Sequence, residues 1–412
     1  MPSFQAIATV LGLLLILGAL ASGLAQRSFL SLTALFVLAG FALGPGGFGK
    51  IDFRPHSGFV EDLAFAALIV ILFRDGLEVD SELLQSQWQL PLRKLAIAMP
   101  ITAVVVALAA RVLVGLSWTE SFLLGALLSP TDPVLSSSVV NDPRVPRIVR
   151  HSLNLESGLN DGLALPAVLA FAAALEPNGA SFVWWHFVLQ DVGLGLVFGL
   201  VCGLVGSLLM PEREREHPDQ PIPAHQKALY GLGLAFATYG LTVLPPHGNG
   251  FIAVFVAAIV LGNRRPDLRR CFAERTEEVV EIVKLAIFAV FGSLLSIDGL
   301  FADGWAAVAV AAVTFLLARP LAIWIALAGT RMSSASKAFI AWFGPKGVAT
   351  MAFSLLVLSR QIDAGERIFN IAALAVLASI LVHGATEDPG VSWIARHDSA
   401  TERSVPERAP GG

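Results

Sequence analysis

The chain of 412 residues is 55% hydrophobic and only 15% charged, with a mean hydropathy of +0.71. Soluble domains average about 45–50% apolar and 25% charged residues, so this composition excludes a set of soluble domains and predicts a polytopic protein of the lipid bilayer. A formal net charge of −4, with no Lys/Arg cluster among aromatic residues, argues against a nucleic-acid partner. Two cysteines are too few for a disulfide framework or a metal cluster, and we expect neither a cofactor nor enzymatic activity.

Thirteen apolar stretches, bounded by charged or Pro/Gly-rich segments, are each near the length of about 20 residues that a membrane helix needs. We therefore predict an all-α polytopic membrane protein with thirteen transmembrane helices in residues 1–386. The tail of residues 387–412 is predicted to be disordered and cytoplasmic. The predicted spans are 4–25, 29–44, 57–77, 93–116, 119–141, 151–175, 182–210, 226–244, 247–262, 275–297, 303–329, 336–358 and 365–383.

The distribution of Lys and Arg indicates how these spans are oriented. If the N-terminus is outside and the C-terminus inside, nearly all basic residues of the loops lie on the cytoplasmic side of the cell membrane. A wrong number of spans would exchange the two sides partway along the chain and remove this asymmetry. The basic loop residues left outside are Lys50, Arg54, Arg360 and Arg367.

Two predicted spans contain prolines at mid-membrane. The fifth contains Leu128-Ser129-Pro130-Thr131-Asp132-Pro133, and the twelfth contains Phe343-Gly344-Pro345-Lys346-Gly347. Proline removes a backbone hydrogen bond and clashes with the preceding turn, so we expect both helices to be broken there. The two spans cross the membrane in opposite senses, which predicts inverted repeats of spans 1–6 and 8–13 with a binding site where the breaks meet. Two kinks of purely structural origin are the alternative.

The sixth span places polar side chains deep in the bilayer, in the sequence Glu156-Ser157-Gly158-Leu159-Asn160-Asp161-Gly162. Asp161 lies about ten residues, or roughly 15 Å, from the start of the span and thus near the midplane. Polar groups at this depth are costly and are functional candidates by default. A satisfied structural carboxylate is the alternative for Asp161.

Other charged residues of the spans allow structural interpretations. Glu156 and Lys346 are the opposite charges best suited to match each other, so we predict a structural ion pair between them. Arg319 lies nearer to a span end and is expected to snorkel towards water.

Lys284 has Glu277 and Glu281 on its own helix face, which favours a local salt bridge over a role in transport. His383 is at the end of the last predicted span, where a histidine is usually solvated, so we expect a solvated ring, and a pH sensor is the alternative.

The motifs Thr131-Asp132-Pro133, Glu156 to Gly162, and Gly344-Pro345-Lys346-Gly347, with Asp75-Gly76-Leu77, resemble those of the NhaP-type sodium/proton antiporters, the electroneutral branch of the monovalent cation:proton antiporters. The resemblance extends over nearly the whole membrane region. It implies a homodimer in which a core bundle of spans 4–6 and 11–13 moves against the remaining spans. It also implies that Asp161 binds either cation or proton, and that the site includes Asp132, Ser157, Thr131 and Asn160. The family usually has arginine where this chain has Lys346.

The chemistry of these residues suits ion exchange. A buried carboxylate can be neutralised by a proton or by a cation, and this competition is sufficient for antiport if the core moves only when Asp161 is neutral. Because Asn160 does not ionise and the charges of Glu156 and Lys346 cancel, each cycle exchanges one Na⁺ for one H⁺ at Asp161 and moves no net charge. The resemblance implies that the ligands of the transported Na⁺ are Asp161, Ser157, Thr131 and Asp132, and it favours Na⁺ with Li⁺ as a second cargo.

Several alternatives stay open. A potassium/proton exchanger, or an electrogenic exchanger that uses Lys284, requires the same kind of site. An intramembrane aspartyl protease with Asp132 and Asp161 as its dyad is disfavoured, because Pro133 directly follows Asp132 and no Gly-x-Gly-Asp sequence surrounds either residue. A channel is disfavoured because it needs no titrating group in its path.

Overall fold

The computed structural model describes residues 12, 16, 32–51, 53–55, 57–79, 89–132, 139, 142–177, 179, 182–211, 222–245, 247–360 and 362–402. Every regular element in these residues is helical, as the sequence predicts. The first predicted span lies outside the described residues, apart from Gly12 and Ile16.

Each predicted span from the second onwards contains at least one helix. Some spans include π-helical turns (η), through which the helix continues, and others end early at a break. The elements are α2 (Leu32–Leu43), α3 (Gly58–Glu78), α5 (Gln89–Arg93), η1 (Lys94–Ala98), α6 (Met99–Ala109), η2 (Ala110–Val114), α7 (Trp118–Leu127), α9 (Arg147–Leu175), α10 (Trp184–His186), η5 (Phe187–Val192), α11 (Gly193–Leu209), α13 (Ala224–Val243), α14 (Gly250–Arg264), α15 (Pro266–Ser293), α16 (Ile297–Leu300), α17 (Trp305–Val313), η6 (Thr314–Ala318), α18 (Arg319–Ala326), α19 (Ser334–Trp342), α20 (Val348–Ser359) and α21 (Gly365–Glu402).

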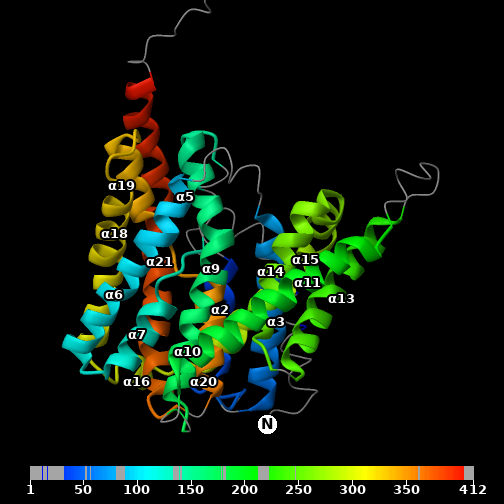
Figure 1. Cartoon of the computed structure of the whole chain (residues 1–412). Coiled ribbons are helices and arrows are strands. Elements are labelled where there is room, and N and C mark those ends of the chain that lie inside the picture. The colour runs from blue at the N-terminus through cyan, green and yellow to red at the C-terminus, as the bar shows by residue number, and fades with distance from the viewer. Residues whose placement is uncertain are drawn as a thin grey trace, which may run out of the picture.

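The helices form two bundles (Figure 1). One, the left bundle, includes α6, α7, α9, α18, α19 and α21, and the other, the right bundle, includes α3, α11, α13, α14 and α15. Helices α9 and α20 pack against α3 and α14 or α15, and so connect the two bundles. Buried apolar side chains, among them Phe73, Phe255 and Phe353, make this contact continuous.

Helix length and composition agree with a membrane protein. Within the described residues, five helical runs are long and apolar enough to cross a bilayer: Lys94–Val114, Arg147–Leu175, Trp184–Leu209, Trp305–Ala326 and Gly365–His397. The apolar helices α2, α14 and α20 are shorter, with 12, 15 and 12 residues.

Both predicted helix breaks are present. Helix α7 ends at Leu127, and residues 128–132 have no helical structure, while Pro133 lies outside the described residues. Helix α19 ends at Trp342, residues 343–347 have no helical structure, and α20 begins at Val348. The prolines therefore end their helices, as their missing N–H groups require.

The prediction of a disordered tail from residue 387 is wrong as far as residue 402. Helix α21 continues to Glu402, with Pro389 inside it. The reason is packing, because Val391 and Ile394 are 2% and 0% exposed and contact the apolar cluster of α19. Residues 403–412 lie outside the described part of the chain.

Candidate functional site

The two breaks meet, and main-chain atoms make much of the junction. The amide of Asp132 donates to the carbonyl of Pro345 at 2.9 Å, and the amide of Val348 donates to Oδ2 of Asp132 at 3.2 Å. Asp132 thus accepts a hydrogen bond at the N-terminus of α20, where the helix dipole favours a negative charge. A Cβ at Gly347 would overlap the Asp132 side chain, so only glycine permits this approach.

Lys346 adds a side-chain hydrogen bond to this junction. Its side chain is fully buried, and Nζ donates to the carbonyl of Pro130 at 3.1 Å. That carbonyl has no partner within a helix because α7 ends before it, so the lysine satisfies a group that the break releases.

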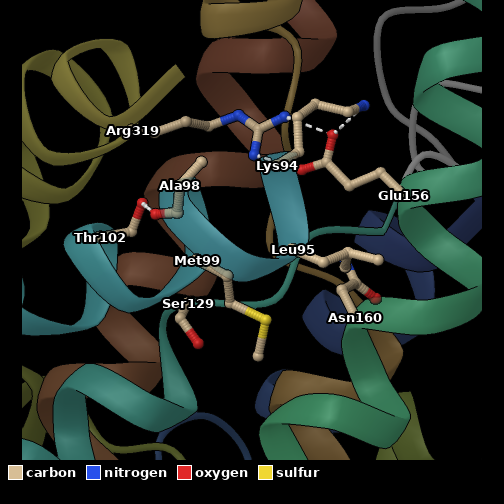
Figure 2. Close-up of a pocket in the computed structure, with 9 residues that line it drawn as sticks. All are labelled: Lys94, Leu95, Ala98, Met99, Thr102, Ser129, Glu156, Asn160 and Arg319. Carbon is tan, nitrogen blue, oxygen red and sulfur yellow. Dashed lines mark hydrogen bonds and ion pairs between the residues drawn. The ribbon is translucent and has the colours of Figure 1, made fainter. Parts of the chain in front are cut away.

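Glu156 on α9 binds two cations other than the predicted one. Its carboxylate lies 2.9 Å from Nζ of Lys94 on η1 and 2.8 Å from Nη1 of Arg319 on α18. Figure 2 shows Glu156 facing both side chains. In the described residues no ion pair joins Glu156 to Lys346, so that prediction is wrong. The physical reason is that η1 and α18 bring two cations to Glu156, whereas Lys346 is directed to the carbonyl of Pro130.

Arg319 does not snorkel, contrary to expectation. The residue is 5% exposed, and its guanidinium also donates to the carbonyls of Ile340 and Phe343 at 3.3 Å each, where α19 ends. A Cβ at Gly344 would overlap this guanidinium, which explains the first glycine of the twelfth-span motif. Arg319 therefore connects Glu156 to the second break.

Asn160 and Thr131 link the ion pairs to the first break. Nδ2 of Asn160 donates to the carbonyl of Thr131 at 2.6 Å, and the Thr131 hydroxyl donates to Glu156 at 3.0 Å. Oδ1 of Asn160 is buried and finds no hydrogen-bond partner among the described residues. Asn160 also lines a small cavity of about 10 Å³, enough for roughly one water. Figure 2 shows the lining residues, which also include Ser129, Lys94 and Arg319.

Asp161 is the next residue of α9 and differs from Glu156 in its surroundings. It is 3% exposed, and Oδ1 is buried without a hydrogen-bond partner in the part of the chain that the structure describes. The charges that act on it belong to Asp75 on α3, Asp132 at the first break, Lys284 on α15 and Arg74. Buried polar atoms nearly always have a partner, so a carboxylate oxygen without one requires an explanation.

The sequence interpretation missed some of these residues. Asp75 is 7% exposed and belongs to the acidic group around Asp161, although it entered the sequence analysis only as part of a flanking motif. Lys94, near the start of the predicted span 93–116, is 1% exposed, and the sequence analysis gave it no role. The side chain of Ser157 lies outside the described part of the chain.

The structure also changes the interpretation of Lys284. In the described residues no ion pair joins Lys284 to Glu277 or Glu281, so the predicted local salt bridge is absent there. Both glutamates are exposed, whereas Lys284 is buried. The charged groups that act on it are Arg74, of the same sign, and the carboxylates of Asp132, Asp75 and Glu78. Across the described chain, no three His, Cys, Asp or Glu side chains are grouped closely enough to bind a metal ion.

Comparison with known proteins decides the family. The family model for the transmembrane sodium/hydrogen exchangers matches residues 9–393. The chain belongs to the sodium/hydrogen exchanger family. The helical fold of this exchanger is similar to that of the sodium proton antiporter MjNhaP1 from Methanocaldococcus jannaschii, with a TM-score of 0.78 and 21% identity over 95% of this chain and 99% of that one.

Curated relatives support the NhaP-type resemblance. The exchanger is 24% identical to the K(+)/H(+) antiporter NhaP of Alkalimonas amylolytica, over 93% of this chain and 66% of that protein. It is 26% identical to the K(+)/H(+) antiporter NhaP2 of Shewanella oneidensis, over 91% of this chain and 64% of that protein. It is 29% identical to the Na(+)/H(+) antiporter NhaG of Bacillus atrophaeus, over 70% and 55%. The chain thus spans slightly less than two thirds of the length of the first two relatives.

Proposed function

We propose that this exchanger is a secondary active transporter that exchanges a monovalent cation for a proton across the cell membrane. The observation that carries the proposal is Oδ1 of Asp161, a buried carboxylate oxygen without a hydrogen-bond partner beside the junction of two broken helices. A proton or a desolvated cation neutralises such a group, and each excludes the other. Asp161 is therefore the residue for which the two ions compete.

We propose further oxygen ligands for the cation beside Asp161. The proposed cation site contains the Asp132 carboxylate, the hydroxyls of Thr131 and Ser157, and the Asn160 side chain. Hard oxygen ligands suit small monovalent cations. Asp75 adds a third carboxylate from the right bundle, and Lys284 balances part of this negative charge.

The cation is proposed to be Na⁺, with Li⁺ as a second cargo, and K⁺ is the alternative. The named relatives include both K⁺/H⁺ and Na⁺/H⁺ antiporters. Because Asp161 neutralises one charge in either state, the exchange is proposed to be 1:1 and electroneutral.

An electrogenic exchange is the second candidate, and the position of Lys284 favours it. A buried lysine that interacts with Asp132 and Asp75 can lose its own proton when a cation binds these carboxylates. A second proton would then move in each cycle.

The transporter is proposed to have thirteen spans in residues 1–386, with the N-terminus outside, the C-terminus inside and inverted repeats of spans 1–6 and 8–13. The core bundle of spans 4–6 and 11–13 corresponds to α5–α9 and α17–α21, and it is proposed to move against the remaining spans in a homodimer. Supporting this division, α9 and α20 contact the right bundle mainly at α3, α14 and α15.

The proposal is tested by dye-quench antiport in everted vesicles with Asp161→Asn. We expect the variant to lose exchange with Na⁺, Li⁺ and K⁺ alike, because the amide can neither bind a proton nor offer a charge to the cation. Asp298→Asn, at an exposed carboxylate on α16, is the matched control and should retain exchange. Cation-dependent proton movement in the Asp161 variant would remove this residue from its proposed role.

A further inference from the structure

One face of α21 contacts the second helix break through polar side chains. Ser379, His383 and Thr386 are spaced four and three residues apart, so they share a helix face. Ser379 accepts from the amide of Lys346 at 2.9 Å, and Thr386 accepts from Nε1 of Trp342 at 2.9 Å. Nε2 of His383 lies 2.9 Å from the carbonyl of Trp342. All three side chains thus bind the segment in which the twelfth span is broken.

His383 and Ser379 form a chain of hydrogen bonds from the carbonyl of Trp342 to the amide of Lys346, which we call the relay. The carbonyl of Trp342 can only accept, so Nε2 of His383 carries the proton and Nδ1 of a neutral ring is an acceptor. Oγ of Ser379, 3.1 Å from Nδ1, donates to it while accepting from the amide of Lys346. Nδ1 also lies 2.9 Å from the carbonyl of Ser379, which can accept only from a ring with a second proton. In either protonation state the ring contacts Trp342 and Ser379, and Ser379 binds Lys346, so His383 joins the two ends of the break.

His383 is buried, contrary to the sequence expectation of a solvated ring. It is 3% exposed, and the rings of Phe315, Trp342 and Phe343 surround it at 5.8, 5.8 and 6.4 Å between centroids. Water cannot easily replace its hydrogen bonds in this apolar setting, so losing them leaves a backbone carbonyl and a hydroxyl unpaired.

The segment held by this relay is the one that meets Asp132. Between Trp342 and Lys346 lies Pro345, whose carbonyl accepts from the amide of Asp132, and Val348 donates to the Asp132 carboxylate. A change in the backbone of residues 343–347 must therefore change the position of Asp132.

We propose that His383 and Ser379 are positioning residues for the cation site, which they shape by holding residues 343–347 in the conformation that bonds Asp132. This inference rests on the proposed transport function, because the site it shapes is the proposed cation site. Neither residue touches the transported ion.

The test compares His383→Ala and Ser379→Ala with His397→Ala in dye-quench assays. His397 is the control because it lies on the same helix but is exposed, with Nδ1 2.8 Å from the carbonyl of Trp393. We expect the two relay variants to raise the apparent KM for the cation by about tenfold, as expected when a buried hydrogen-bond partner is removed, with a smaller change in Vmax. The control should keep the wild-type KM.

Conservative variants separate positioning from folding. His383→Asn can keep an acceptor for the Ser379 hydroxyl, and His383→Gln can keep a donor for the Trp342 carbonyl. Each should restore part of the wild-type KM relative to His383→Ala. A lower melting temperature with an unchanged KM in all relay variants would reduce the relay to a purely structural role and overturn the proposal.

A second measurement does not depend on transport. Hydrogen–deuterium exchange of the peptide that covers residues 342–348 should be faster in His383→Ala and Ser379→Ala than in His397→Ala. If the wild type shows no cation/proton exchange, the proposed function fails, and this measurement still decides the relay. If the wild type transports and the relay variants match it in both KM and deuterium uptake, the positioning role of His383 and Ser379 is overturned while the proposed transport function stands.

Discussion

Glu156 is a buried carboxylate held by two cations, and the two are not equivalent. Lys94 gives it a single ammonium contact and also donates to the carbonyl of Ser152. Arg319 contacts both carboxylate oxygens, at 2.8 and 3.4 Å, and also binds the end of α19. Arginine is suited to this bridging role because its planar guanidinium has five donors.

Removing Arg319 should therefore be strongly destabilising. We expect Arg319→Ala to lower the free energy of unfolding by about 3–5 kcal/mol, because Glu156 loses one charge partner and two carbonyls lose their donor. Thermal unfolding of the detergent-solubilised protein measures the effect. Arg275→Ala, at an exposed site on α15, is the control, and equal melting temperatures for the two variants would contradict the bridging role.

A different charged group, outside the predicted spans, gives a pH prediction. Asp267 begins α15, and although burial opposes its ionisation, hydrogen bonds from Arg265 and Lys227 lower its pKa from 3.8 to about 2. A lowered pKa in the folded state adds stability above the unfolded value, and this stability is lost as the pH falls towards 2.

Asp267→Asn should thus lower the melting temperature at pH 6, and the difference from the wild type should shrink between pH 4 and pH 2. The charge is partly solvated, so the effect should be modest. A difference that stays constant across this pH range would show that the carboxylate charge is not its source.

At the scale of helices, α9 contacts α14 of the right bundle in the turn next to Asp161. A Cβ at Gly162 on α9 would overlap the ring of Phe255 on α14. A Cβ at Gly158, one turn earlier, would lie 3.5 Å from the carbonyl of Asp75, an ordinary contact. Because Gly162 has no side chain, the ring of Phe255 can lie directly against α9.

Gly162→Ala should reduce Vmax and stability, because overpacking of this kind costs about 1–3 kcal/mol. Gly158→Ala is the matched control on the same helix and should be close to the wild type. Adding Phe255→Leu should restore exchange in the Gly162 variant, since the smaller side chain makes room for the methyl group. Failure of this rescue would place the defect elsewhere. Dye-quench assays and thermal unfolding measure both effects.

The helix breaks could be predicted from the sequence, whereas the partners of the charged residues could not. Pro130 and Pro345 disfavour a helix by local chemistry, through the missing N–H group and the clash with the preceding turn, although α9 and α21 continue through Pro166 and Pro389. The partner of Glu156 depends on how η1, α9 and α18 lie in space, which no spacing within one span reveals. Arg319 illustrates the difficulty, because an arginine near a span end has the same sequence pattern whether it snorkels or is buried. The helical extension of α21 was missed because its apolar residues, Val391 and Ile394, are few and follow Pro389.

For the whole molecule, the proposed stoichiometry predicts no response to voltage. Moving one charge across the membrane is worth about 2.3 kcal/mol per 100 mV, so even one unbalanced charge per cycle would be detectable. In proteoliposomes with an inward Na⁺ gradient, an electroneutral exchanger generates no potential that an oxonol dye reports.

A potential of either sign would favour the electrogenic alternative. Lys284→Ala then decides its origin. If Lys284 carries the second proton, the potential disappears in the variant while Asp161-dependent exchange continues.

The junction of the two breaks has an evolutionary consequence. Peptide groups at positions 130, 132, 345 and 348 are donors or acceptors in it. The bond from the amide of Asp132 to the carbonyl of Pro345 needs no side chain, whereas the other two bonds need the Lys346 ammonium and the Asp132 carboxylate. Residues outside this set can therefore diversify, and with them the choice of cargo, while the contact between the two breaks keeps its shape. Homologues with different ion preferences can therefore share one architecture.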